Sequence, residues 1–180
     1  MYTYVKKLLL LSTILFLFGS WSDNLQLQEK NTPAIIKASY VYNFAKLVGW
    51  PDKKSKGNFT IGILGDPDLY KQIVEKYSGK KIGNQSIEII QLLGVEQLPE
   101  MHILFISRQL SDKTPQITTK LSKEPIMIIT ESRNGLQQGA VLNFVVVDSQ
   151  QKFEISESNA DKHGLTIGST LKSLAHKLVK

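Results

Sequence analysis

The chain has 180 residues, a formal net charge of +6 and no cysteine. A chain of this length predicts a single domain with its own hydrophobic core, and the lack of cysteine excludes disulfides and thiol chemistry. The basic residues are scattered along the chain rather than clustered, which argues against nucleic acid as a partner.

The first 22 residues have the pattern of a secretory signal peptide. Lys6 and Lys7 precede an apolar run over 8–18, and the small residues Ser20 and Ser22 follow it. A spanning helix needs roughly 20 apolar residues, about twice the length of this run. We therefore expect cleavage after Ser22, with an uncleaved membrane anchor as the second interpretation. Cleavage lowers the net charge to +4, because the segment carries two lysines and no acid.

A long helix is predicted to open the domain, which we place at 32–180. Residues 23–31 are polar and without a period, so a flexible leader is expected before it. Thr32 can cap the helix, and Pro33 suits its first position. Gly49 and Pro51 favour its end. One face is apolar, and a second apolar stripe lies beside it, which predicts packing on a sheet and against another helix or a partner. These residues are Ala34, Ala38, Val41, Ala45 and Val48 on the first face, and Tyr40, Phe44 and Leu47 on the second.

The segment after this helix is predicted to form a corner. Gly49, Trp50 and Pro51 follow one another there. We expect Trp50 to close one end of the core beneath the helix. Residues 52–58 are rich in lysine, glycine and serine, and they are predicted to form a solvated loop.

Buried strands and short helices alternate over the middle of the chain. Apolar runs predict strands at 59–64, 86–92, 102–107 and 125–130. Asp66 can cap a short helix that starts at Pro67 and ends before Gly79, and a second helix is expected near 113–121. This alternation favours a mainly parallel sheet with helices on its faces.

The last third of the chain has a different pattern. Strands at 141–148 and 151–156 are separated by Ser149 and Gln150, which predicts an antiparallel hairpin. Ser156 can cap a short helix that ends at Gly164. Ser169 can cap a final helix with its apolar residues on one face and lysines near its end: Leu171, Leu174, Ala175 and Leu178, then Lys177 and Lys180. The predicted fold is α/β, one domain, with a mostly parallel sheet, a C-terminal antiparallel hairpin and helices on both faces.

No motif of catalysis or metal binding is apparent. His102, His163 and His176 are far apart and have no ligand spacing. No Gly-x-Ser-x-Gly elbow is present, and the glycines at 62 and 65 lack the Gly-Lys-Ser/Thr ending of a phosphate-binding loop. We expect no metal, no cofactor and no enzymatic activity, with a hydrolase site assembled from dispersed loops as the least favoured alternative.

The loops after three of the strands form the one candidate ligand site. Ligands bind beyond the carboxyl ends of strands in open parallel sheets, and these loops offer hydroxyls, a guanidinium and amides at helix starts. They predict a pocket for a small molecule or an anion, and the alternative is that the residues are only caps and turns. The residues are Gly65, Asp66, Ser107, Arg108, Thr130, Glu131 and Ser132.

Four blocks follow one another in order from residue 37 to residue 171. They are 37–51 (KASYVYNFAKLVGWP), 128–144 with IITES and GAVLNF, 152–156 (KFEIS) and 164–171 (GLTIGSTL). Together they resemble the YfiR-like family of exported bacterial proteins, over nearly the whole chain after the leader. The resemblance implies a periplasmic regulator that restrains a membrane-bound signalling enzyme, typically a diguanylate cyclase. Some relatives carry bridging cysteines, and His102 stands where many have one, so redox control of that kind is not expected here.

The leading hypothesis is therefore a periplasmic protein that binds and restrains the extracytoplasmic part of a membrane signalling protein, of the diguanylate cyclase or histidine kinase type. Tyr40 and Phe44 on the first helix, and Leu171 and Leu178 on the last, are the candidates for its contact surface; core packing is the alternative for all four. The second hypothesis is a periplasmic small-molecule-binding module. The oligomeric state stays open, a homodimer included.

Overall fold

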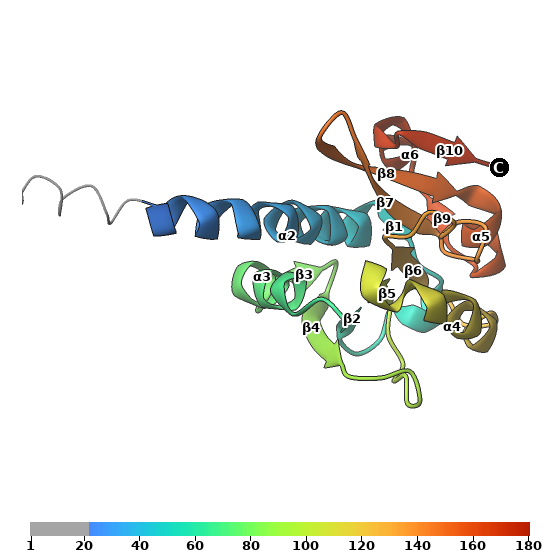
Figure 1. Cartoon of the computed structure of the whole chain (residues 1–180). Helices are drawn as coiled ribbons and strands as arrows, with labels where there is room; N and C mark the ends of the chain where they lie inside the picture. The colour runs from blue at the N-terminus through green and yellow to red at the C-terminus, as the bar shows by residue number, and fades with distance from the viewer. Residues whose placement is uncertain (1–21) are drawn as a thin grey trace, which may run out of the picture. The chain divides into compact units, whose positions relative to one another are not determined.

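The computed structural model describes the backbone of residues 22–180 and side chains from Pro33 onward. Most of the predicted signal peptide lies outside the described residues. Within the described part, no helix has both the length and the apolar character needed to cross a bilayer. The α-helices there are α2 (Ser22–Leu47), α3 (Pro67–Tyr77), α4 (Thr114–Lys120), α5 (Glu157–Lys162) and α6 (Ser169–Leu174) (Figure 1). Two 3-10 helices span Asp52–Lys54 and Arg108–Lys113.

The main sheet of the described residues has eight strands, in the order β10-β8-β7-β6-β5-β2-β4-β3. The pairings from β4 through β2, β5 and β6 to β7 are parallel, β7 with β8 is an antiparallel hairpin, and β10 is parallel to β8. The predicted fold class is thus confirmed. The strands are β2 (Phe59–Leu64), β3 (Lys81–Ile82), β4 (Gln85–Leu92), β5 (Ile103–Ile106), β6 (Met127–Thr130), β7 (Leu142–Val147), β8 (Gln150–Ser156) and β10 (Lys177–Val179).

Helix α2 starts earlier and ends earlier than predicted. It begins at Ser22, so residues 23–31, predicted as a flexible leader, are helical, with Pro33 inside the helix. The segment is rich in good helix formers such as leucine, glutamine and glutamate, which favour a helix even without an apolar period. The helix ends at Leu47, because Val48 and Gly49 form β1 and pair with β9 (Thr166–Ile167).

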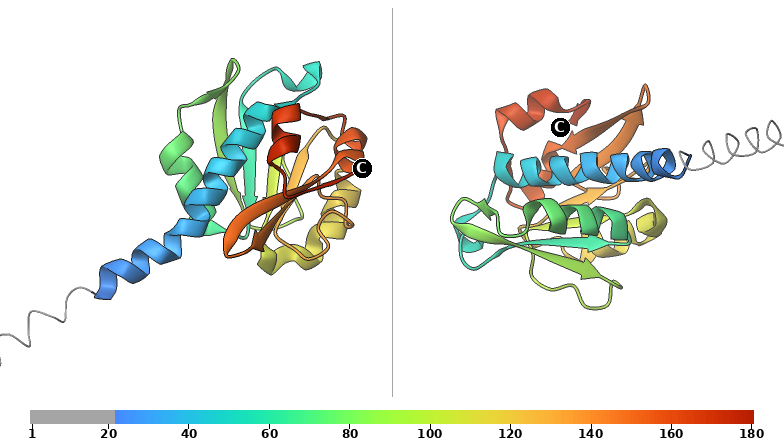
Figure 2. Two further views of the ribbon diagram at one scale, coloured as in Figure 1. Left: turned by 90° about the horizontal axis from the view of Figure 1, so that it is seen from above. Right: turned by 90° about the vertical axis from the view of Figure 1, so that its left-hand side faces the viewer.

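The two faces of the sheet carry separate cores. Ile61 and Ile63 of β2 point to a core that α2 and α3 cover, whereas Leu64 points to a second core beneath α4. Helices α2 and α3 lie side by side on the first face (Figure 2), where the rings of Tyr42 and Tyr77 stack at 4.3 Å. This arrangement confirms the prediction that the first helix packs on a sheet and meets another helix.

The C-terminal prediction is correct in part. Ser156 Oγ accepts a hydrogen bond from the Asn159 amide at 3.3 Å and so caps α5, as expected. The N-cap of α6 is Gly168 rather than Ser169, and the helix stops at Leu174. Leu178, predicted on that helix, lies in strand β10 instead. Pairing with β8 outweighs the helical period here, because a weak local preference yields to tertiary contacts.

Both edges of the main sheet are short strands. β10 has three residues and β3 has two. Each carries a lysine, Lys177 at one edge and Lys81 at the other, and both are exposed. The hairpin between β7 and β8 turns at Asp148 and Ser149, whose φ angles are +50° and +60°. The turn therefore lies one residue before the predicted Ser149-Gln150.

Candidate functional site

The carboxyl ends of β2, β5 and β6 meet at one edge of the parallel sheet, as predicted. Gly65 directly follows β2 with a φ of +80°. A Cβ at this position would lie 2.4 Å from Ser107 Oγ, beyond the end of β5. Only glycine fits this close approach, so the first two of the three predicted loops are in contact.

A lysine from α2 joins two of the predicted residues. Lys37 Nζ lies 2.6 Å from Asp66 Oδ2 and 2.9 Å from Glu131 Oε2. The Lys37 side chain is only 9% exposed, and the two carboxylates are 16% and 17% exposed. Its ammonium also sits 5.2 Å from the centre of the Phe105 ring in β5. We call Lys37, Asp66 and Glu131 the strand-end charge cluster.

Asp66 has a second role in the fold. Its Oδ1 accepts a hydrogen bond from the Leu69 amide at 2.9 Å and caps α3, as predicted. Its other oxygen is left for Lys37. One carboxylate therefore fixes both the start of a helix and the position of the buried ammonium.

The third predicted loop, which follows β6, is held by hydrogen bonds to an asparagine of β7. Asn143 Oδ1, in β7, accepts hydrogen bonds from Thr130 Oγ1 at 2.9 Å and from the Ser132 amide at 3.0 Å. A Cβ on Gly135 would lie 2.0 Å from Thr130 Oγ1, so the backbone there packs directly on this pair. These contacts anchor the loop that carries Glu131 to β7.

Two of the predicted hydroxyls and the predicted guanidinium take no part in the ion pairs of the charge cluster. Ser107 Oγ and Ser132 Oγ are buried and have no hydrogen-bond partner among the described residues. Arg108 is exposed. Asp66 thus caps a helix, the Ser132 amide bonds to Asn143, and Lys37 faces the two carboxylates. Ligand binding by these loops stays a prediction.

Sequence reasoning missed Lys37, although a signal for it was present. Lys37 lies three residues after Ala34 and four before Val41, on the apolar face of the helix. A single charged residue on such a face must find a partner when the face is buried. The complementary charges could have been sought among the acids at the strand ends.

Comparisons with known proteins place the chain in a family. The model of the YfiR/HmsC-like family matches residues 34–176. The chain belongs to the YfiR/HmsC-like family. The family consists of periplasmic, non-enzymatic regulators of membrane signalling proteins. No curated protein matches the sequence.

Two solved structures resemble the YfiR/HmsC-like fold of this chain. One is the ABC domain from Streptococcus pneumonia in complex with L-Trp, with 13% identity and a TM-score of 0.54, covering 82% of this chain and 60% of that one. The other is a conserved domain protein from Vibrio cholerae O1 biovar El Tor, with 8% identity, a TM-score of 0.54, and coverages of 78% and 59%. This chain thus spans about three fifths of each. At these identities the likeness shows the fold alone.

The residues predicted to contact a partner of this YfiR/HmsC-like protein differ in exposure. Phe44 and Leu171 are each 1% exposed and belong to the core, so they offer no contact surface. Tyr40 is half-buried against the rings of Phe44 and Phe153. Only Leu178, 39% exposed, lies on the surface as the contact prediction requires. Phe44 is buried because the aromatic rings of β7 and β8 pack against it.

A second polar cluster lies at the opposite ends of the strands. His102, just before β5, accepts a hydrogen bond from the Thr60 amide at Nδ1 (3.1 Å), and its Nε2 lies 2.9 Å from the Lys54 carbonyl oxygen. A carbonyl only accepts, so Nε2 carries the proton of the neutral ring. The Lys54 side chain is 4% exposed, and its Nζ pairs with Glu100 at 2.8 Å. Among the side chains that the structure describes, from Pro33 onward, no three acidic or histidine residues are grouped as metal ligands, and the absence of a metal stays a prediction.

The His102 site predicts a loss of stability in mild acid. Burial lowers the pKa of His102, and the nearby Lys54 ammonium adds to this effect, while the hydrogen bond to the Lys54 carbonyl opposes it. The unfolded chain, with an ordinary histidine pKa of about 6.5, therefore binds the proton first. The free energy of unfolding should fall as the pH drops below about 6.5, by up to about 1.4 kcal/mol per unit. Urea denaturation measured above and below that pH checks this.

A His102→Gln variant isolates this effect, because glutamine can keep both hydrogen bonds and does not titrate. The variant should lose less stability than the wild type over the same pH range. Equal losses in the two proteins would show that other groups cause the acid sensitivity.

Proposed function

We propose that this protein binds the extracytoplasmic part of a membrane-bound signalling protein, of the diguanylate cyclase or histidine kinase type, and restrains it. The membership of residues 34–176 in a family of such regulators carries the proposal. A binding protein biases its target only when its affinities for the two states of the target differ. Restraint therefore means tighter binding to the inactive state.

We also propose that the first 22 residues direct the chain to the periplasm and are removed. Their charge, apolar run and small residues support this. N-terminal sequencing of the exported protein should begin near Asp23. An intact Met1 in the membrane fraction would contradict the proposal.

The apolar surface next to the C-terminus is the best candidate for the contact. Leu174 is 61% exposed and Leu178 is 39% exposed, and they lie in α6 and in the edge strand β10. Stable interfaces have apolar centres and bury about 800 Å² on each partner. These two leucines replace the buried Phe44 and Leu171 in the proposed surface.

Deleting the gene should raise the second-messenger level or the kinase output, and the wild-type gene should restore the low level. A Leu174→Glu/Leu178→Glu variant should fail to restore it, because two charges at the centre of an apolar interface oppose binding. The output measurement should be paired with cross-linking of the mature protein to membrane proteins.

A Leu93→Glu variant serves as the matched control. Leu93 is 96% exposed and directly follows β4, near the other edge of the sheet. This variant should restore the low output as the wild type does. If deletion leaves every output unchanged and no membrane protein is cross-linked, the regulatory proposal fails.

A small-molecule-binding module is the second candidate function. The buried hydroxyls of Ser107 and Ser132 support it, because buried polar groups are usually hydrogen-bonded and these two have no partner in the part of the chain that the structure describes. A ligand that binds the folded state should raise the melting temperature by mass action. A thermal-shift screen against metabolites tests this candidate separately from the regulatory one. A hydrolase with a dispersed site remains the third and least supported candidate.

A further inference from the structure

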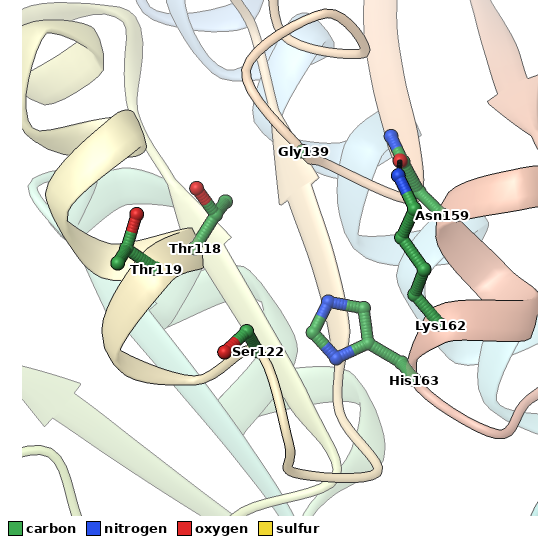
Figure 3. Close-up of a pocket in the computed structure, with 7 residues that line it drawn as sticks. All are labelled: Thr118, Thr119, Ser122, Gly139, Asn159, Lys162 and His163. Atoms are coloured by element: carbon green, nitrogen blue, oxygen red, sulfur yellow. Dashed lines mark hydrogen bonds between the residues drawn. The ribbon is translucent and has the colours of Figure 1, made fainter.

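A pocket of about 490 Å³ opens between α4 and α5 (Figure 3). It shares no residue with the strand-end charge cluster. Its buried residues are Thr118, Asn159 and His163, and its exposed residues include Thr119, Ser122 and Lys162. Gly139 completes the lining. A volume of this size lies within the range of small-molecule sites, roughly 300–1,000 Å³.

The threonine hydroxyls of the pocket donate their hydrogens to backbone carbonyl groups. Thr118 Oγ1 donates to the Gln138 carbonyl at 2.7 Å, and the Pro115 carbonyl lies 3.1 Å from the same oxygen. Thr119 Oγ1 donates to the Pro115 carbonyl at 2.8 Å. A hydroxyl has one hydrogen and two lone pairs. Both threonines can therefore only accept further hydrogen bonds.

The side-chain amide of Asn159 also donates its hydrogens to backbone carbonyl groups. Its Nδ2 donates to the Leu136 carbonyl at 2.8 Å and to the Ala140 carbonyl at 2.9 Å. These two bonds use both amide hydrogens. The side-chain oxygen is left as an acceptor, with Lys162 Nζ at 3.4 Å.

The imidazole of His163 also presents an acceptor. Its Nδ1 lies 2.7 Å from the Glu124 carbonyl oxygen, which can only accept, so Nδ1 carries the proton of the neutral ring. Nε2 then offers its lone pair, and no hydrogen bond to it is formed by the residues that the structure describes. The ring lies between α4 and α5 (Figure 3).

We propose that this pocket binds a neutral, polyhydroxylated ligand, such as a sugar or a sugar unit of a glycan. Such a ligand carries many donor hydrogens, which match the acceptors on Thr118, Thr119, Asn159 and His163. Its oxygens can accept from Lys162 at the rim. The proposal is independent of the regulatory function.

The positive charge of Lys162 and the lack of free donor hydrogens on the buried groups argue against ionic ligands. Lys162 repels a cation at the rim. An anion needs several donors directed at it, and the buried groups of the pocket have none left. Lys162 and the Ser122 hydroxyl are the remaining side-chain donors in the lining, and both are exposed.

The test is a titration of the isotopically labelled full chain, followed by the amide signals in two-dimensional NMR. D-glucose, N-acetyl-D-glucosamine and its β-1,4-linked disaccharide are the sugar probes, and inorganic phosphate and methylammonium are the ionic ones. At least one sugar should shift signals within 118–122, at Gly139 and within 159–163. The ionic probes should not.

A Thr119→Val variant removes one exposed acceptor and keeps the shape of the side chain. It should raise the dissociation constant of the sugar by about threefold or more, the loss expected for one hydrogen bond. A Ser122→Ala variant provides a second test at the other exposed hydroxyl. Thr170→Val, at an exposed threonine of α6, should leave the constant unchanged. The proposal is overturned if no sugar shifts these signals, if only an ionic probe does, or if both pocket variants bind as the wild type does.

Discussion

Replacing Lys37 by methionine is expected to lower the free energy of unfolding by about 3–5 kcal/mol. Methionine keeps most of the length of the side chain and removes its charge. Asp66 and Glu131 would then face each other without a cation, in positions where each is less than one fifth exposed. Removing one partner of a buried ion pair costs far more than the pair contributes. Chemical denaturation of the two proteins measures the difference.

Neutralising the two acids should rescue this variant. Adding Asp66→Asn and Glu131→Gln to Lys37→Met should restore at least half of the lost stability. Asparagine also caps helices well, so the start of α3 is kept. Lys71→Met, at an exposed lysine of α3, is the control and should change the stability by less than about 0.5 kcal/mol. A Lys37→Met protein as stable as the wild type would show that the cluster contributes nothing to the fold.

Replacing Trp50 by alanine should have the second large effect, a loss of about 3 kcal/mol in the free energy of unfolding. Trp50 is half-buried, and its ring packs edge-on against Phe59 and His102 at 5.2 and 5.4 Å. Its Nε1 donates to the Ala45 carbonyl at 3.1 Å, across the end of α2. The substitution opens a cavity where the predicted corner meets the core.

A Trp50→Phe variant separates packing from hydrogen bonding. It keeps an aromatic ring and loses the bond to Ala45, so its cost should be about 1 kcal/mol. If Trp50→Ala leaves the midpoint of denaturation unchanged, the packing on Phe59 contributes nothing, and Trp50 becomes a candidate for a partner contact.

The sequence predicted the central strands well because their signal is local. β2 matches the prediction residue for residue, and β4 to β8 agree at their centres with small shifts at their ends. Apolar runs between turn residues are enough to find buried strands. The two-residue strands β1, β3 and β9 have no such signal, since pairing alone defines them. Strand β10 was not predicted, because its residues continue the apolar period of a helix.

The sequence predicted that the three loops meet at one edge of the sheet, and the binding of a ligand there stays a prediction. The rule for parallel sheets correctly brought Asp66 and Glu131 together. It could not predict the role of Lys37, because this residue lies in a helix, 29 residues before Asp66 and 94 residues before Glu131 in the sequence. The pocket between α4 and α5 was missed for the same reason, since neither Thr118 nor Asn159 forms a motif with its sequence neighbours.

The short edges of the main sheet bear on how this protein behaves at high concentration. An exposed edge strand can template pairing with another chain, and short strands with lysines oppose such aggregation. At one edge β3 offers two residues and an exposed Lys81, and at the other β10 offers three with an exposed Lys177. A dimer built by joining two sheets edge to edge would gain few backbone hydrogen bonds at either side. Any self-association of this chain should therefore use side-chain surfaces, and it should not extend into fibrils through the sheet.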